Sequence, residues 1–136
     1  MNFMGGEKVI FVCVENAGRS QMAEAFFKKH APRSFQAVSA GTKPALRLNP
    51  VVVQVMREVG IELTGKPKTL TSEDLFQYFK AINMGCMDRE SCPVLFANNV
   101  EDWDIPDPKG KSLNEVRVIR GQIESRVKEL VAHLKK

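Results

Sequence analysis

The sequence predicts an α/β fold with a mainly parallel sheet, because short apolar, β-branched runs alternate along the chain with amphipathic helical segments. The run at residues 9–12 is continuously apolar, which is typical of a strand buried on both faces. The final segment has apolar side chains three or four positions apart, as expected for a helix that packs on a sheet. With 136 residues, against roughly 150 for a typical domain, residues 1–136 are expected to form one domain.

The other elements follow from the same periodicities and from boundary signals. Further strands are expected at residues 35–40, 81–84 and 100–103. Helices are expected at residues 20–31, 50–59, 71–79 and 112–134. Pro50 suits a first helical turn, Gly60 suits a helix end, Thr71 can cap the short helix, and Ser112 with Glu115 forms a capping box. Residues 105–110 contain two prolines and a glycine, so they are expected to form a loop.

Composition and charge exclude several classes of protein. The chain is 43% hydrophobic and 26% charged, which favours a folded soluble domain over a disordered one. Its longest strictly apolar run, residues 9–14, is far shorter than the ~20 residues that cross a bilayer. The N-terminus lacks the cationic start and cleavage site of a secretory signal, so a cytoplasmic protein is expected. A net charge of +4 without a basic cluster gives little support for nucleic-acid binding.

Three cysteines are too few for a disulfide scaffold, and in a reducing compartment they are expected to be thiols. Cys86 and Cys92 are separated by five residues, whereas zinc sites usually pair Cys-x2-Cys with further ligands. The two histidines, His30 and His133, are far away in the sequence. No metal site is therefore expected.

The string CVENAGRS, residues 13–20, lies between the first strand and the first helix and is the strongest chemical signal in the sequence. A loop that enters a helix presents unpaired backbone N–H groups, and the helix dipole adds positive potential there. Asn16 tolerates a positive φ, Gly18 allows unusual backbone angles, and Arg19 offers a planar bidentate donor. We therefore expect an oxyanion-binding loop formed by Val14, Glu15, Asn16, Ala17, Gly18, Arg19 and Ser20.

Cys13 stands at the base of this loop, where the helix end, Arg19 and the Ser20 hydroxyl all favour a thiolate. It is therefore the candidate nucleophile. The alternative interpretation is an inert cysteine at a strand end with a surface arginine, but spacing and context together favour catalysis. Glu15 does not fit an anion site, because its carboxylate would repel the substrate. Its side chain is expected to point outward to solvent.

The sequence resembles the low-molecular-weight protein tyrosine phosphatase superfamily and, within it, the thioredoxin-coupled arsenate reductases. The resemblance covers nearly the whole chain. It depends on CVENAGRSQMAEAFF at residues 13–27, SAG at 39–41, MGC at 84–86, CP at 92–93 and WDIPDPKG at 103–110. Other Cys-x5-Arg phosphatases have the loop late in the chain, with the acid upstream. Here the loop comes first, and this order indicates the low-molecular-weight superfamily.

The resemblance implies a three-layer fold with a four-stranded parallel sheet in the order 2-1-3-4. Ligands bind such sheets at the switch point, between the carboxyl ends of strands one and three, where Cys13 and Cys86 would stand. Adjacent strands are ~4.8 Å apart, so these thiols would come near disulfide reach. Asp107 matches the family's Asp-Pro general acid, although an Asp-Pro turn without chemistry is the simpler alternative.

Two functions from different classes remain: reduction of arsenate and hydrolysis of a phosphotyrosine. A phosphatase needs Cys13, Arg19 and Asp107, whereas a reductase also needs a second and usually a third thiol, which Cys86 and Cys92 supply. Lys109 and Gly110 follow the Asp-Pro pair, where phosphatases tend to have aromatic residues. We therefore predict a monomeric arsenate reductase that has no tightly bound cofactor and takes electrons from reduced thioredoxin, with phosphate and sulfate as competing oxyanions. A noncatalytic anion sensor or redox switch is a third possibility.

Overall fold

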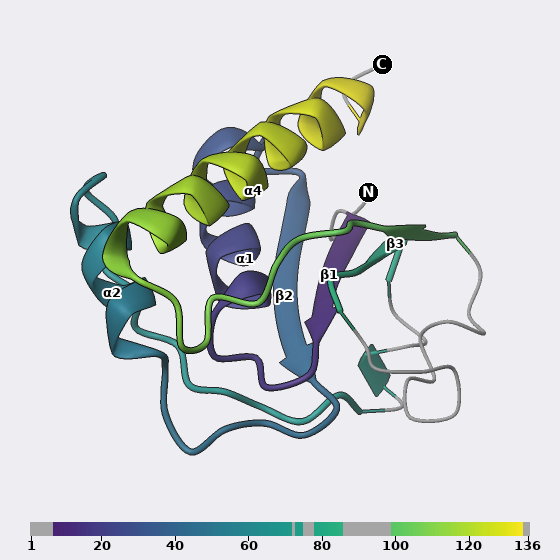
Figure 1. Ribbon diagram of the computed structural model, residues 1–136. Helices are drawn as coiled ribbons and strands as arrows, with labels where there is room; N and C mark the ends of the chain where they lie inside the picture. The colour runs from purple at the N-terminus through teal and green to yellow at the C-terminus, as the bar shows by residue number, and fades with distance from the viewer. Residues whose placement is uncertain (1–6, 72, 75–77, 86–98, 135–136) are drawn as a thin grey trace.

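The computed structural model describes residues 7–71, 73–74, 78–85 and 99–134 (Figure 1). Its four strands form one sheet in the order β2-β1-β3-β4, and every adjacent pair is parallel. The strands are β1 (Glu7–Cys13), β2 (Phe35–Gly41), β3 (Lys80–Asn83) and β4 (Val100–Asp102). The predicted α/β class and strand order are thus confirmed. In this register Cys13 lies opposite Gly41 of β2, at the carboxyl end of the sheet.

Three helices have described boundaries: α1 (Arg19–His30), α2 (Pro50–Arg57) and α4 (Leu113–Leu134). They lie together on one side of the sheet in Figure 1, and their apolar residues form one core with the β1 side chains Val9 and Phe11. The other face of β1 packs through Ile10 and Val12 in a smaller cluster, which includes the partly buried Leu70. Both faces of β1 are therefore covered, as its continuous apolar run predicts.

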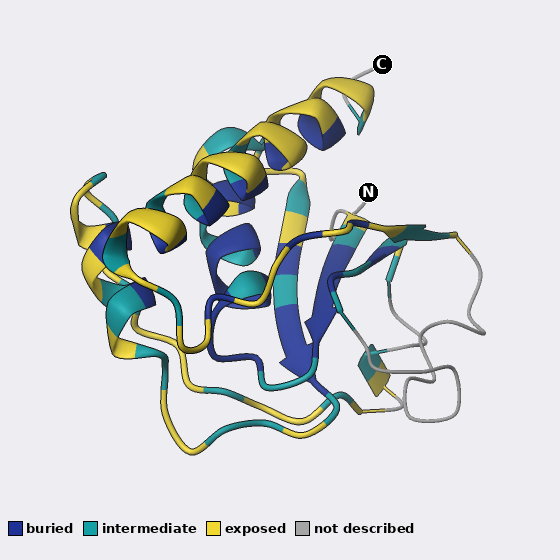
Figure 2. Ribbon diagram, viewed as in Figure 1, coloured by how far each residue is buried: buried dark blue, intermediate teal, exposed yellow. Residues whose placement is uncertain are grey.

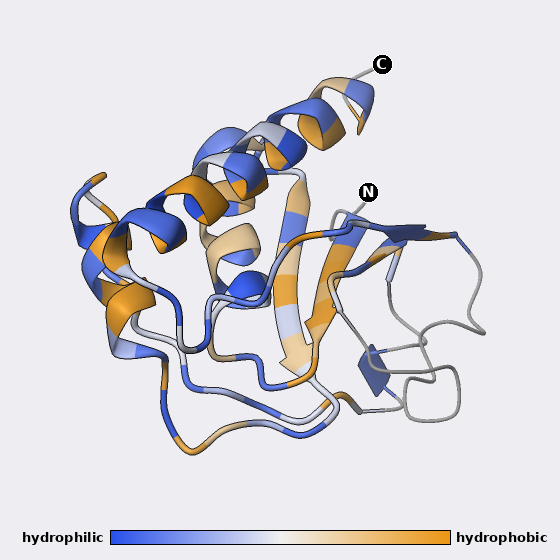
Figure 3. Cartoon of the chain, in the orientation of Figure 1, coloured by the Kyte–Doolittle hydropathy of each residue, from blue (hydrophilic) through white to orange (hydrophobic). Residues whose placement is uncertain are grey.

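The core is centred on β1, whose residues from Val9 to Cys13 are all buried (Figure 2). The Phe11 ring lies between Phe27 of α1 and Trp103 after β4, with ring centroids 5.9 Å and 5.8 Å apart. Figure 3 shows hydrophobic residues along β1 and hydrophilic residues on the outer side of α4. Aromatic packing therefore joins the helical layer to the strand that leads into the candidate site.

Most of the predicted capping residues lie at the ends of helices. Asn49 accepts hydrogen bonds from the first amides of α2, and Gly60 follows this helix with a φ of +80°. Ser112 accepts a hydrogen bond from the Glu115 amide while the Glu115 carboxylate accepts one from the Ser112 amide, which is the expected capping box. The short helix expected at residues 71–79 falls partly outside the described residues. Within the described ranges, no helix has the length and apolar character needed to cross a membrane.

Candidate active site

The loop between β1 and α1 has a series of backbone N–H groups that find no acceptor among the described residues. Its carbonyl groups accept hydrogen bonds from a neighbouring segment: those of Cys13, Val14, Glu15 and Ala17 bond to the amides of Thr42, Lys43, Ala45 and Asn49 at 3.2, 2.8, 2.9 and 3.0 Å. By contrast, no described residue accepts a hydrogen bond from the N–H groups of residues 14–18. α1 also begins without a side-chain cap. These amides and the positive end of the helix dipole are therefore available to an anion.

Asn16 fixes the shape of this loop. It is fully buried, and its φ of +52° is the left-handed turn that the sequence suggested. Its side-chain oxygen accepts hydrogen bonds from the Gln21 amide at 3.1 Å and from the backbone N–H of Lys68 at 3.0 Å. Its side-chain nitrogen donates to the Ser20 hydroxyl at 2.7 Å. Because two donors converge on one atom of Asn16, that atom must be the oxygen, which sets the direction of the bond to Ser20.

Cys13 is buried at the end of β1, and its Sγ atom lies 2.9 Å from the Ser20 Oγ atom. Ser20 already accepts a hydrogen bond from Asn16, so its own proton is free to be donated to the sulfur. A thiolate has no proton and can only accept in this contact. The chain from Asn16 through Ser20 to Cys13 therefore directs a hydroxyl proton at the sulfur.

Arg19, the first residue of α1, is held in place by parts of the chain that are distant in sequence. Its Nη1 atom donates to the Ile105 carbonyl at 3.0 Å, and its Nη2 atom lies 3.7 Å from the Asp107 carboxylate. Gly85, just after β3, has a φ of +128°. A Cβ atom there would lie 2.7 Å from Arg19 Cζ, so any larger residue would push the guanidinium out of its present position.

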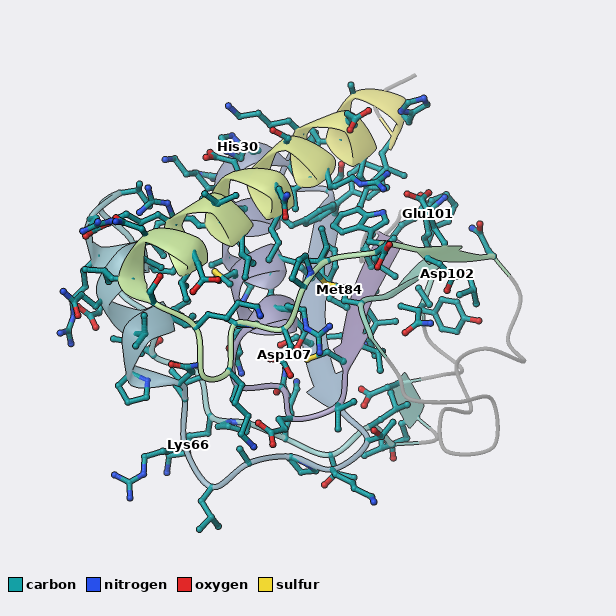
Figure 4. All side chains as sticks on the ribbon, viewed as in Figure 1. His30, Lys66, Met84, Glu101, Asp102 and Asp107 are labelled. Atoms are coloured by element: carbon teal, nitrogen blue, oxygen red, sulfur yellow. The ribbon has the colours of Figure 1, made fainter. Side chains whose placement is uncertain are left out.

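The segment that contains Asp107 packs directly on the loop. A Cβ atom on Gly18 would lie 2.8 Å from Pro108 Cγ, so the absence of a side chain at residue 18 allows this approach. The φ of Gly18 is −144°, and it is Asn16 that takes the left-handed conformation. Asp107, labelled in Figure 4, has a half-exposed side chain and lines one small pocket together with Cys13 and Arg19. The structure therefore brings these three predicted site residues together.

Glu15 also lines this pocket, and its side chain reaches solvent as the sequence predicts, but there it is paired with a cation. Its Oε2 atom lies 3.0 Å from the Nζ atom of Lys109, so these two pocket-lining residues form an ion pair. The hydrogen bond to Glu15 and the charge of its carboxylate raise the pKa of Lys109 above its ordinary value. The misfit between a carboxylate and an anion site is thus offset by a cation 94 residues further along the chain.

Sequence reasoning missed three contributors to this site: Gln21, Gly85 and Lys109. Gln21 had a recognisable signal, since it is a polar residue beside the apolar stripe of α1. Lys109 and Gly85 had no signal beyond their place in the motifs WDIPDPKG and MGC, because their importance depends on which distant side chains they meet. The predicted relay residues Cys86 and Cys92 lie outside the described residues. Within the described part of the chain, no cluster of three metal-binding side chains is found.

Fold and site together define a class of α/β proteins in which a strand-loop-helix unit presents free amides and an arginine around a buried cysteine. The family model "Low molecular weight phosphotyrosine protein phosphatase" matches residues 8–136. This chain therefore belongs to that family.

Curated relatives cover most of the chain. A putative arsenate reductase of Halobacterium salinarum is 37% identical over 130 residues, which span 88% of this chain and 87% of the relative. The glutaredoxin arsenate reductase of Synechocystis is 34% identical over 94% of this chain and 98% of the relative.

Solved structures show the same fold. The thioredoxin-dependent arsenate reductase of Corynebacterium glutamicum is 32% identical, with a TM-score of 0.81 over 96% of this chain, which spans 62% of that longer chain. An arsenate reductase in its phosphate-binding state is 33% identical, with a TM-score of 0.83 over 93% of this chain and 98% of its own. A mutant of YwlE arginine phosphatase with a phosphorylated active-site serine is 26% identical, with a TM-score of 0.85 over 95% of this chain and 96% of its own.

Proposed function

We propose that this protein is an arsenate reductase, which converts arsenate to arsenite through a covalent intermediate on Cys13. The observation that carries the proposal is the set of amides at residues 14–18 that no described residue binds, near a buried cysteine and Arg19. This arrangement suits a tetrahedral oxyanion with one or two negative charges. Phosphate and sulfate share that shape, so geometry alone does not select the substrate. The choice of arsenate is based on the relatives and neighbours named as arsenate reductases.

In the first step, the Cys13 thiolate attacks arsenic while the loop amides and Arg19 hold the other oxygens. A sulfur–arsenic bond forms, and one arsenic–oxygen bond breaks. Asp107 lines the same pocket and donates a proton to the departing oxygen, which leaves as water. The product is an arsenate adduct on Cys13, in which arsenic is still in its +5 state.

In the second step, a thiolate of Cys86 attacks the sulfur of Cys13. The sulfur–arsenic bond breaks, and its electron pair moves to arsenic, which leaves as arsenite in the +3 state. The two sulfurs, oxidised by two electrons, form a Cys13–Cys86 disulfide. Cys92 then attacks Cys86, which frees Cys13 and leaves a Cys86–Cys92 disulfide. The roles of Cys86 and Cys92 rest on the sequence, because both lie outside the described residues.

A thiol donor must reduce the Cys86–Cys92 disulfide before the next turnover. We propose thioredoxin, because the oxidising equivalent ends on a pair of cysteines of this chain, and an exchanging dithiol protein can reduce such a pair directly. The thioredoxin-dependent neighbour of Corynebacterium glutamicum supports this choice, and the glutaredoxin arsenate reductase of Synechocystis makes glutaredoxin the alternative. No tightly bound cofactor is needed.

Hydrolysis of a phosphate ester is the second candidate function. The likeness to YwlE arginine phosphatase supports it, since the first half of the reaction, transfer of an oxyanion to Cys13, would be the same. The two functions differ only in what removes the adduct, which is water for phosphate and Cys86 for arsenate. The Lys109–Gly110 pair after Pro108 argues against an aryl ester, because no aromatic residue follows Pro108 there.

The test is arsenate-dependent consumption of NADPH in the presence of thioredoxin and thioredoxin reductase, run beside hydrolysis of p-nitrophenyl phosphate. We expect sustained consumption that requires both arsenate and thioredoxin. The Cys13→Ser variant should lose both activities, because each begins at that sulfur. Hydrolysis of the ester without arsenate-dependent consumption with either thioredoxin or glutaredoxin would support the phosphatase instead.

A further inference from the structure

The ion pair between Glu15 and Lys109 joins the anion loop to the segment that contains the proton donor. Its two ends come from two different segments that line the pocket, since Glu15 follows β1 and Lys109 follows the Asp107–Pro108 pair. The Nζ–Oε2 distance is 3.0 Å. Both residues line the pocket that Cys13 and Arg19 also line, so the ion pair belongs to the wall of the site where the oxyanion would bind.

We propose that this ion pair is a specificity-determining clasp, which favours free inorganic oxyanions and disfavours organic phosphate esters. The inference rests on the proposed function, because it concerns the substrate class of the same site. It assigns a role to two residues whose charges otherwise have no part in the chemistry.

The position of the leaving group supports the clasp. In an in-line attack by Cys13, the departing oxygen faces away from the sulfur and toward the proton donor Asp107. Lys109 is tied to that donor, since its backbone N–H donates to Asp107 Oδ1 at 3.0 Å. From arsenate only a water molecule leaves on this side. From an ester, an organic group must lie there and would have to displace the bond between Lys109 and Glu15.

The charges of the two residues also balance around the pocket. The Glu15 carboxylate would repel an oxyanion, and the Lys109 ammonium neutralises it. Removing the carboxylate alone frees Lys109 to attract the anion, whereas removing Lys109 alone leaves the carboxylate unpaired beside the anion. The two single substitutions should therefore change anion affinity in opposite directions, which an ion pair remote from the pocket would not do.

The substitutions should leave the fold intact. The side chains of Glu15 and Lys109 are 38% and 69% exposed, so neither leaves a buried charge unpaired. Two other contacts join the same segments: Pro108 packs on Gly18, and Arg19 lies 3.7 Å from Asp107. The proton donor should therefore stay near the pocket when the clasp is removed.

The experiment compares wild type with Glu15→Gln, Lys109→Ala and the double variant. Two quantities are measured: the inhibition constant of orthophosphate, and kcat/KM for p-nitrophenyl phosphate. Orthophosphate should bind about threefold more tightly to Glu15→Gln and about threefold more weakly to Lys109→Ala, with the double variant near wild type. The double variant should hydrolyse the ester about fivefold faster, because the clasp no longer competes with the organic group. Glu62→Gln is the matched control, since it breaks the exposed Arg57–Glu62 pair at 2.9 Å and should change neither quantity.

The clasp is wrong if both single variants shift orthophosphate inhibition in the same direction, or if the double variant hydrolyses the ester no faster than wild type. Neither measurement requires Cys86, Cys92 or an electron donor. Failure of wild type to reduce arsenate would therefore overturn the proposed function without affecting this test.

Discussion

Asn16 offers the sharpest test of how the anion loop is built, and we predict that Asn16→Ala strongly destabilises the protein. The Asn16 side chain is fully buried and makes hydrogen bonds to Gln21, Lys68 and Ser20. Alanine would leave the Lys68 amide without its partner and would remove the group that orients Ser20. It would also occupy a backbone position with a φ of +52°, which asparagine tolerates better.

The expected loss of unfolding free energy combines the broken hydrogen bonds with the backbone strain. Asn16 and its partners Ser20 and Gln21 are buried, so the broken hydrogen bonds cost about 1–3 kcal/mol; alanine in the left-handed region costs about 1–2 kcal/mol, and the total is about 2–5 kcal/mol. Because a domain of this size is stable by only about 5–15 kcal/mol, such a loss would be easy to measure. Asn16→Gly separates the two terms, since glycine relieves the backbone strain but restores no hydrogen bond.

The assay is urea unfolding at pH 7, with Asn99→Ala as the matched control. Asn99 also has a left-handed backbone, with a φ of +58°, but its side chain is exposed and donates a hydrogen bond to the Phe79 carbonyl. We expect the control to lose about 1–2 kcal/mol, mainly from the backbone. Equal losses in Asn16→Ala and Asn99→Ala would refute the claim that the buried polar network holds the loop.

Three further substitutions test the arginine and the helix packing. Arg19→Lys should weaken orthophosphate inhibition by about tenfold or more, because an ammonium lacks the bidentate donor geometry. Inhibition equal to that of wild type would show that the Arg19 guanidinium does not bind the anion. Gly85→Ala should also weaken it, since the new Cβ would lie 2.7 Å from Arg19 Cζ, and an unchanged inhibition constant would show that the contact is dispensable. Hydrogen bonds from Arg117 and Arg120 lower the pKa of Glu58 from 4.5 to about 2. Glu58 therefore adds stability above pH 4.5 that is lost as the pH falls toward 2. The urea midpoints of wild type and Glu58→Gln should differ at pH 7 and converge near pH 2. A difference that stays constant over this range would contradict the role of Glu58.

The fold was largely predictable because its signals are local. The apolar run of β1, Pro50 at the start of α2 and the capping box at Ser112 depend on neighbours in the sequence, and each acts as expected. Strand order needed the family resemblance, because periodicity does not say which strands pair. β1 begins at Glu7, two residues earlier than expected, because its pairing with Phe35 of β2 extends past the apolar run.

The site was predictable only where its residues lie in one motif. Cys13, Asn16 and Ser20 are within eight residues, and the positive φ of Asn16 follows from its chemistry. The contact between Gly85 and Arg19 joins residues far apart in sequence, as does the pair between Glu15 and Lys109. Neither contact leaves a trace in local composition, so only the folded chain reveals them.

The central claim, an arsenate adduct on Cys13 resolved by thiols of the same chain, is tested most directly by a single turnover of Cys92→Ser. Arsenate is added to the reduced variant without thioredoxin, arsenite is counted, and disulfides are located by peptide mapping. We predict about one arsenite per enzyme and a trapped Cys13–Cys86 disulfide, because the last exchange has lost its attacking thiol. The Cys86→Ser variant should release no arsenite. Arsenite released by Cys86→Ser at the wild-type rate, or a Cys92→Ser variant with Cys13 still free, would contradict the relay.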